Sequence, residues 1–135
     1  MIPVYQTLTV NKDGTGNCVA ACLASVLERP LRELPSILPN NTDNFWGAWN
    51  GWLQTHDLRL RFHPLTLGHP SGYHFASGIT DRVYPECHPN QGEEIMHMVV
   101  CYDGLIIHDP FPGGEGLKEI KYYWTLLPRT HSGDD

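Results

Sequence analysis

Gly-Asn-Cys-Val-Ala-Ala-Cys-Leu-Ala-Ser-Val-Leu, residues 16–27, predicts a helix that is entered through a glycine-rich turn. The helix is expected from about Asn17 to Glu28, because Pro30 disfavours helical geometry at the residue before it. Cys18 then lies in the first turn, where unpaired backbone N–H groups and the helix dipole stabilise a thiolate. The thiolate is the nucleophilic form of cysteine, so this stretch predicts that Cys18 is a catalytic nucleophile.

Length and composition indicate one globular domain, expected over residues 1–127, followed by a disordered tail over residues 128–135. The formal net charge of -6, with no cluster of Lys and Arg, argues against nucleic acid as a partner. The N-terminus lacks the pattern of a signal peptide, and no apolar stretch approaches the length of a membrane span. We therefore expect a cytoplasmic protein without a membrane partner, in which the four cysteines are free thiols. The sequence does not indicate an oligomeric state.

Sequence patterns place the other elements approximately. Alternation of apolar and polar residues predicts strands at 4–10, 58–65, 73–79, 95–101, 105–109 and 120–127. Aromatic residues at helical spacing predict a second helix that is capped by Thr42 or Asp43. Residues 80–94 are rich in Pro, Gly and Asn, which predicts a long surface loop.

Three further residues supply the groups that a cysteine nucleophile needs. Cysteine hydrolases use a histidine to move protons, a carboxylate or amide to hold the histidine, and N–H donors to stabilise the oxyanion. His97 and Asp109 lie on the two strands predicted at 95–101 and 105–109, and Gln6 provides a side-chain amide upstream of Cys18. Each residue alone has an ordinary structural interpretation, but the ordered set predicts acyl transfer that requires no metal or organic cofactor.

The turn between those two strands decides whether the triad can form. A two-residue turn at Asp103-Gly104 would leave His97 and Asp109 on opposite faces of the hairpin. A three-residue loop that begins at Tyr102, with Gly104 left-handed, would set His97 directly opposite Asp109. The triad hypothesis therefore predicts the three-residue loop.

The Gly-Asn-Cys-Val-Ala-Ala-Cys-Leu-Ala-Ser-Val-Leu run, then His-Met-Val-Val at 97–100 and His-Asp-Pro at 108–110, resembles papain-like cysteine peptidases. The resemblance is specifically to the small double-glycine peptidase-like domains of bacteria and phages, and it covers residues 6 to 117. It implies an α+β, papain-like fold in which the N-terminal catalytic helix packs against an antiparallel β-sheet.

The same resemblance implies roles for individual residues. Cys18 would be the nucleophile, His97 the base, Asp109 the orienting acid and Gln6 the donor of the oxyanion hole. Gln6 precedes Cys18 by twelve positions (18 − 6), more than is usual in those peptidases, so Asn17 is an alternative donor.

The predicted function is a cysteine-dependent hydrolase or acyl transferase that acts on a peptide, isopeptide or thioester carbonyl of a peptide or protein substrate. One alternative is a catalytically silent peptide-binding or inhibitory module of the same fold. Another is a structural zinc domain, in which Cys18 and Cys22 would bind an ion together with Cys101 or His108. The absence of a Cys-x-x-Cys pair disfavours zinc.

Overall fold

The computed structural model describes residues 1–10 and 15–129. Two α-helices, two short 3-10 helices and a five-stranded sheet make up this part of the chain, which confirms the α+β class. In chain order they are α1 (Cys18–Leu27), η1 (Leu31–Glu33), α2 (Phe45–Gln54), β1 (Leu58–Pro64), η2 (Leu65–Leu67), β2 (Tyr73–Val83), β3 (Glu94–Tyr102), β4 (Leu105–His108) and β5 (Glu119–Pro128).

Helix α1 follows the sequence prediction closely and forms the centre of the core. It ends where Glu28 adopts a left-handed conformation at φ 56°. Every residue from Val19 to Ser25 is buried, so the helix is surrounded on all sides rather than packed along one stripe. Three of these residues are alanines, and their short side chains allow the neighbouring elements to pack close to the helix.

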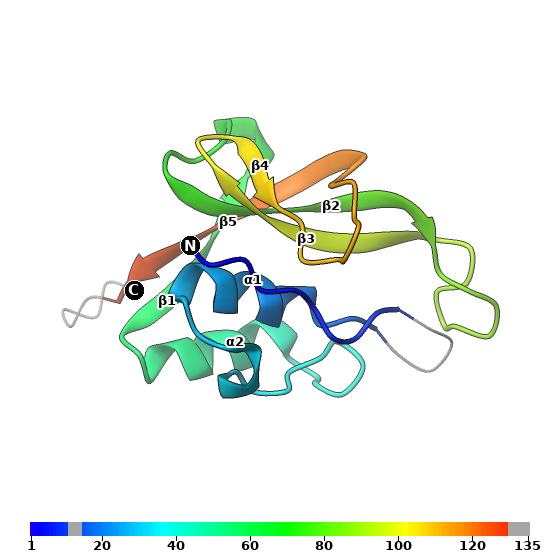
Figure 1. Ribbon diagram of the computed structural model, residues 1–135, viewed down its shortest axis with the longest axis horizontal. Coiled ribbons are helices and arrows are strands. Elements are labelled where there is room, and N and C mark those ends of the chain that lie inside the picture. Colours follow the sequence, from blue (N-terminus) through cyan, green and yellow to red (C-terminus); the bar gives the residue numbers. More distant parts are fainter. Residues whose placement is uncertain (11–14, 130–135) are drawn as a thin grey trace.

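The sheet has the order β1-β5-β2-β3-β4, and every neighbouring pair is antiparallel. Both helices lie on one side of it (Figure 1), where the main hydrophobic core includes Leu23, Trp49, Phe75 and Val100. A smaller cluster of Ala76, Val99, Cys101 and Tyr123 forms on the sheet itself. The last strand in the chain therefore lies between β1 and β2, which local sequence patterns do not indicate.

The turn of the β3–β4 hairpin differs from the prediction, but His97 and Asp109 still lie on the same face of the hairpin. Tyr102 pairs with Leu105, so the turn has two residues, and both Asp103 and Gly104 have positive φ, at 47° and 85°. The predicted three-residue loop is therefore wrong, although the left-handed Gly104 is confirmed. A register shift follows, because Cys101 pairs with Ile106 whereas Val100 pairs with His108. This bulge adds one residue to the β4 side and restores the alternation that the triad needs.

The strand predicted at 4–10 is wrong, because this segment forms no strand and belongs to no sheet. It is held by separate hydrogen bonds: Ile2 N donates to Ser25 O (3.1 Å), Val4 N to Ser25 Oγ (2.9 Å) and Gln6 N to Pro110 O (2.9 Å). The N-terminal segment thus links the end of α1 to the chain just after β4.

Other predictions require smaller corrections. Strand β2 continues to Val83, so the loop predicted at 80–94 is shorter at its start. Asn44, and neither Thr42 nor Asp43, caps α2 by accepting from Gly47 N (3.2 Å). Pro128, where the disordered tail was expected to begin, pairs with Leu58 in the sheet, and the part of the expected tail at 130–135 lies outside the described residues. Within the described ranges, no helix has the length and apolar character needed to cross a membrane.

Candidate active site

Cys18 is the first residue of α1 and is partly exposed. The side chain of Asn17, the N-cap residue, makes no capping hydrogen bond to the helix. Because an α-helix has no internal partners for its first N–H groups, this uncapped end presents donors and a positive dipole beside the thiol. The local setting is therefore the one that the sequence predicted for a nucleophilic cysteine.

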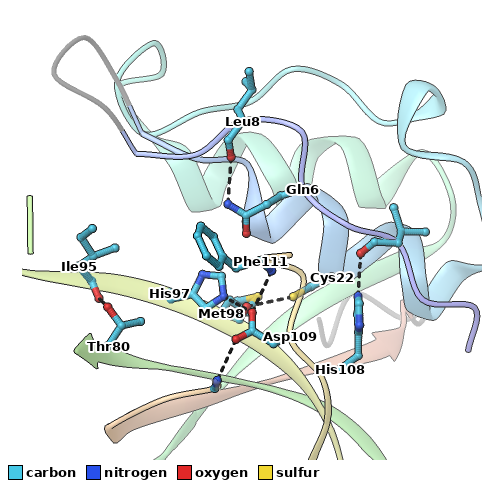
Figure 2. A network of polar contacts seen from close by, with 12 residues as sticks. Gln6, Leu8, Cys22, Thr80, Ile95, His97, Met98, His108, Asp109 and Phe111 are labelled. Atoms are coloured by element: carbon cyan, nitrogen blue, oxygen red, sulfur yellow. Dashed lines mark hydrogen bonds and ion pairs between the residues drawn. The ribbon is translucent and has the colours of Figure 1, made fainter. Parts of the chain in front are cut away.

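His97 and Asp109 form a close, buried pair (Figure 2). His97 Nε2 lies 2.6 Å from Asp109 Oδ1, and the two side chains are only 3% and 10% exposed. His97 is on β3, and Asp109 directly follows β4, so the bulge in the hairpin brings the predicted partners together. Since Nε2 is engaged by the carboxylate, Nδ1 is the ring nitrogen left for the thiol of Cys18.

The loop after β4 fixes the Asp109 carboxylate by backbone hydrogen bonds. Phe111 N donates to Oδ1 (2.9 Å) and Gly116 N donates to Oδ2 (2.9 Å). A Cβ atom on Gly114 would collide with Oδ2, so the loop encloses the carboxylate too closely for a side chain at that position. Phe111 also meets the His97 ring edge-on, with ring centroids 6.4 Å apart.

Electrostatics make His97 a strong base. Burial alone disfavours the imidazolium, but hydrogen bonds and coulombic interactions with Asp109 and Cys18 outweigh it and raise the pKa of His97 to about 9. Burial also acts against the Asp109 carboxylate, yet hydrogen bonds from His97, Phe111 N and Gly116 N leave its pKa below the usual value. At neutral pH these shifts favour the imidazolium form of His97 and the carboxylate form of Asp109.

Gln6 and Asn17 occupy connected positions near the start of α1. Gln6 is buried, and its Nε2 donates to Leu8 O (2.9 Å) (Figure 2). A Cβ atom on Gly16 would lie 2.8 Å from that nitrogen, which places the Gln6 amide against the backbone two residues before Cys18. Asn17 Oδ1 accepts from the N–H groups of Thr7 and Leu8 at 3.1 and 3.0 Å, so it fastens the segment that carries Gln6.

A pocket of about 350 Å³ opens beside Cys18 and His97. Its floor comes from the sheet and its walls from the first turn of α1, the loop after η1 and the start of α2. The residues that give it an apolar lining are Ile37, Pro39, Phe45, Trp46, Met96 and Met98. A substrate could therefore be held next to the thiol by contacts that exclude water.

Sequence reasoning missed several residues around the thiol. Tyr84 hydrogen-bonds the backbone of Met96, and Tyr122 hydrogen-bonds Ser77; burial and the nearby Cys18 raise the pKa of both phenols. Tyr84 follows β2 and Tyr122 lies on β5, and only the sheet order shows that both approach the same site. Phe111 and the glycines after it could have been suspected from the unusual Pro-Phe-Pro-Gly-Gly-Glu-Gly run.

Two of the residues considered as zinc ligands, Cys22 and His108, make hydrogen bonds to backbone carbonyl groups. Cys22 is fully buried and its thiol donates to Met98 O (3.4 Å), while His108 Nε2 donates to Val4 O (2.7 Å). Burial raises the pKa of Cys22 well above its ordinary value and that of Cys101 to about 11, so both thiols stay protonated. Across residues 1–10 and 15–129, no group of three or more His, Cys, Asp or Glu side chains is arranged to bind a metal ion.

Comparisons with known proteins found no family model, no curated protein and no solved structure that matches the chain. The interpretation of the site therefore depends on its own residues and geometry.

Proposed function

We propose that the chain is a cysteine-dependent hydrolase or acyl transferase with a papain-like arrangement of Cys18, His97 and Asp109. The observation that carries the proposal is the 2.6 Å contact between buried His97 Nε2 and Asp109 Oδ1. It leaves the other ring nitrogen for a cysteine that begins a helix. A His–Asp pair that served stability alone would need neither a cysteine at the start of a helix nor a pocket. Here both lie beside the pair, which favours a catalytic role.

In the proposed reaction the Cys18 thiolate attacks the carbonyl carbon of a peptide, isopeptide or thioester. The leaving group takes a proton from the His97 imidazolium as its bond to the carbonyl carbon breaks, which gives a thioester with Cys18. Water or another nucleophile then loses a proton to His97, attacks the thioester and releases Cys18 as the thiolate. Asp109 keeps the imidazole ring in place and stabilises its positive charge throughout.

Two donors are available for the oxyanion that forms during attack. One is the backbone N–H of Cys18 at the start of α1, and the other is the second N–H of Gln6 Nε2, whose first N–H is used by Leu8 O. The Asn17 side chain accepts hydrogen bonds from the backbone N–H groups of Thr7 and Leu8 and donates to Thr7 Oγ1. We therefore propose that Asn17 positions the segment that carries Gln6. These assignments favour Gln6 over Asn17 as the side-chain donor.

The test is the rate at which each cysteine reacts with iodoacetamide at pH 7, followed by mass mapping. Cys18 should react about tenfold faster than the exposed Cys87, because the His97 imidazole beside Cys18 has a raised pKa and is charged near neutral pH. His97→Ala should reduce the Cys18 rate to that of Cys87, which serves as the internal control.

A panel of peptide, isopeptide and thioester substrates then identifies the bond that is cleaved. Equal rates at Cys18 and Cys87 in the wild-type protein would contradict the enzyme proposal. Such a result, with an intact fold, would favour a peptide-binding or inhibitory module instead.

A further inference from the structure

A second cavity, of about 250 Å³, lies beside the glycine-rich loop that supports Asp109. Its lining includes Arg82 near the end of β2, Phe111 and the loop at 113–116. Asp109 also lines it, whereas Cys18 and the described helices do not. The cavity therefore reaches the candidate triad from the side of Asp109 rather than from the side of the thiol.

Arg82 lies in an irregular part of β2 whose backbone is fixed by a neighbouring hydroxyl group. The pairing of β2 with β3 changes register between Ile79 and Val83, and Arg82 is half-buried there. Thr80 Oγ1 donates to Ile95 O (3.1 Å) on β3 (Figure 2) and accepts from Arg82 N (3.2 Å). Irregularities of this kind re-aim a side chain, so the fixed backbone gives Arg82 a defined direction.

The guanidinium group of Arg82 stacks on the ring of Phe111. Its Cζ lies 3.9 Å from the ring centroid, and the same ring meets His97 edge-on (Figure 2). Since 3.9 Å and 6.4 Å separate the consecutive centres, the guanidinium lies at most about 10 Å from the His97 ring. Stacking uses one face of the guanidinium and leaves the N–H groups at its edge available. A positioned cation therefore stands close to the acid of the proposed reaction.

The charge of Arg82 is not neutralised within residues 1–10 and 15–129, where it forms no ion pair. Lys118, the other cation that lines the cavity, is already ion-paired. Asp81 and Glu115 line the cavity too, but both are exposed, so water and salt screen their charge. The Asp109 carboxylate is held by its partners in the triad and the loop. An anionic group of a ligand would therefore find Arg82 available.

The position of Arg82 assigns it to the leaving part of the substrate. Because His97 protonates the leaving group in the proposed reaction, the leaving part lies toward the imidazole. Phe111 follows beyond the imidazole, and Arg82 follows Phe111. A span of about 10 Å corresponds to about three extended residues.

We infer that the leaving part of the substrate carries a carboxylate within about three residues of the cleaved bond, and that Arg82 binds it and determines this specificity. The inference rests on the proposed function and narrows its substrate class. The planar N–H groups of an arginine bind a carboxylate through two parallel hydrogen bonds. The carboxylate has two sources, the C-terminus of the leaving part or an acidic side chain.

The test uses iodoacetyl groups attached to one, two or three glycines, each probe with either a free C-terminal carboxylate or a C-terminal amide. The Cys18 sulfur bonds to the methylene carbon as iodide leaves, so no turnover is needed. A second set ends in an amide and carries glutamate or glutamine in place of one glycine. At one length or position the carboxylate probe should alkylate Cys18 about tenfold faster than its amide counterpart. An advantage of the free acids identifies a C-terminal carboxylate, and an advantage of the glutamate probes identifies an acidic side chain.

Arg82→Gln should bring this carboxylate-to-amide rate ratio close to one. Arg61→Gln removes the same charge from an exposed position on β1, outside the cavity, and should leave the ratio unchanged. Arg82→Lys keeps the charge without the paired N–H groups and should give an intermediate ratio. That variant also serves as the test should Arg82→Gln fail to fold.

The outcomes separate this inference from the function on which it rests. Rapid reaction of Cys18 with iodoacetamide, combined with equal rates for every carboxylate and amide probe, would overturn the carboxylate site and leave the nucleophile intact. Equal slowing of both kinds of probe in folded Arg82→Gln would show that Arg82 only holds Phe111 in place. Failure of every reagent to react faster at Cys18 than at Cys87 would overturn both proposals.

Discussion

The backbone N–H of Gly116 donates to Asp109 Oδ2 across 2.9 Å, and so a glycine seven residues away helps to aim the carboxylate. Together with Phe111 N on the other oxygen, it leaves Asp109 one orientation in which Oδ1 faces His97. The glycine-rich loop after β4 is therefore a support for the candidate triad.

Gly114→Ala should disturb this support, because the added methyl group would collide with Asp109 Oδ2. We expect Cys18 alkylation by iodoacetamide to slow by about tenfold, since a small displacement of the base weakens its action. Gly51→Ala is the control: it lies in α2 with no atom within 4 Å of the new methyl group. That control should keep the alkylation rate and raise the free energy of unfolding by about 0.5–1 kcal/mol. Equal rates in the two variants would show that the loop does not position the carboxylate.

Asp109→Asn should preserve the fold and reduce turnover of the best substrate from the panel by less than Cys18→Ala does. An amide can still accept from an imidazole N–H, but it does not stabilise the imidazolium by charge. The measurement is kcat/KM for both variants, with circular dichroism as the check on folding. Turnover that is unaffected by Asp109→Asn would remove Asp109 from the triad.

The titration of His97 gives a prediction about stability. Its pKa rises from 6.5 to about 9 on folding, so the imidazolium stabilises the native state below pH 6.5 and this contribution is lost as the pH rises through 9. A shift of that size corresponds to about 3 kcal/mol. The difference in unfolding free energy between wild-type protein and His97→Gln, measured with urea, should therefore shrink between pH 7 and pH 10. NMR of the His97 ring should show a midpoint near 9, which falls in Asp109→Asn; a wild-type midpoint near 6.5 would contradict the pairing.

Cys22→Ala tests the packing role of the second cysteine in α1. Cys22 is fully buried and bonded to Met98 O, so its removal should lower the free energy of unfolding by about 1–2 kcal/mol and leave Cys18 reactivity unchanged. Urea unfolding and iodoacetamide labelling measure the two effects separately. Equal loss of activity in Cys18→Ala and Cys22→Ala, with folding intact and zinc detected in the wild-type protein, would favour the zinc alternative.

Local patterns predicted the parts of this fold that depend on neighbouring residues. Helix α1 was predictable because an apolar, alanine-rich run ends before Pro30, and strands β3 and β4 because they flank an Asp-Gly turn. The bulge after Ile106 was not predictable, because an Asp-Gly turn is compatible with more than one loop length. The extra residue in β4 depends on how the strand packs in the complete sheet.

The candidate site was predictable to the same extent. The order and contexts of Cys18, His97 and Asp109 indicated which side chains to combine, and the structure brings His97 and Asp109 together. Ser77 and Tyr122 gave no such signal, because they become neighbours only when β5 inserts beside β2. Long-range strand pairing of this kind is set by the packing of the complete sheet rather than by local sequence.

The hydrogen bond from His108 Nε2 to Val4 O joins residues 104 positions apart, and Gln6 N reaches Pro110 O in the same region. The entropic cost of closing such a long loop precedes the contacts that offset it, so we expect this closure to be late in folding. During synthesis Cys18 emerges well before His97, Asp109 and the loop that supports them. The growing chain therefore carries Cys18 before His97 exists, and we expect Gln6 to reach its place in the candidate site when the segment around Pro110 docks on the N-terminal segment.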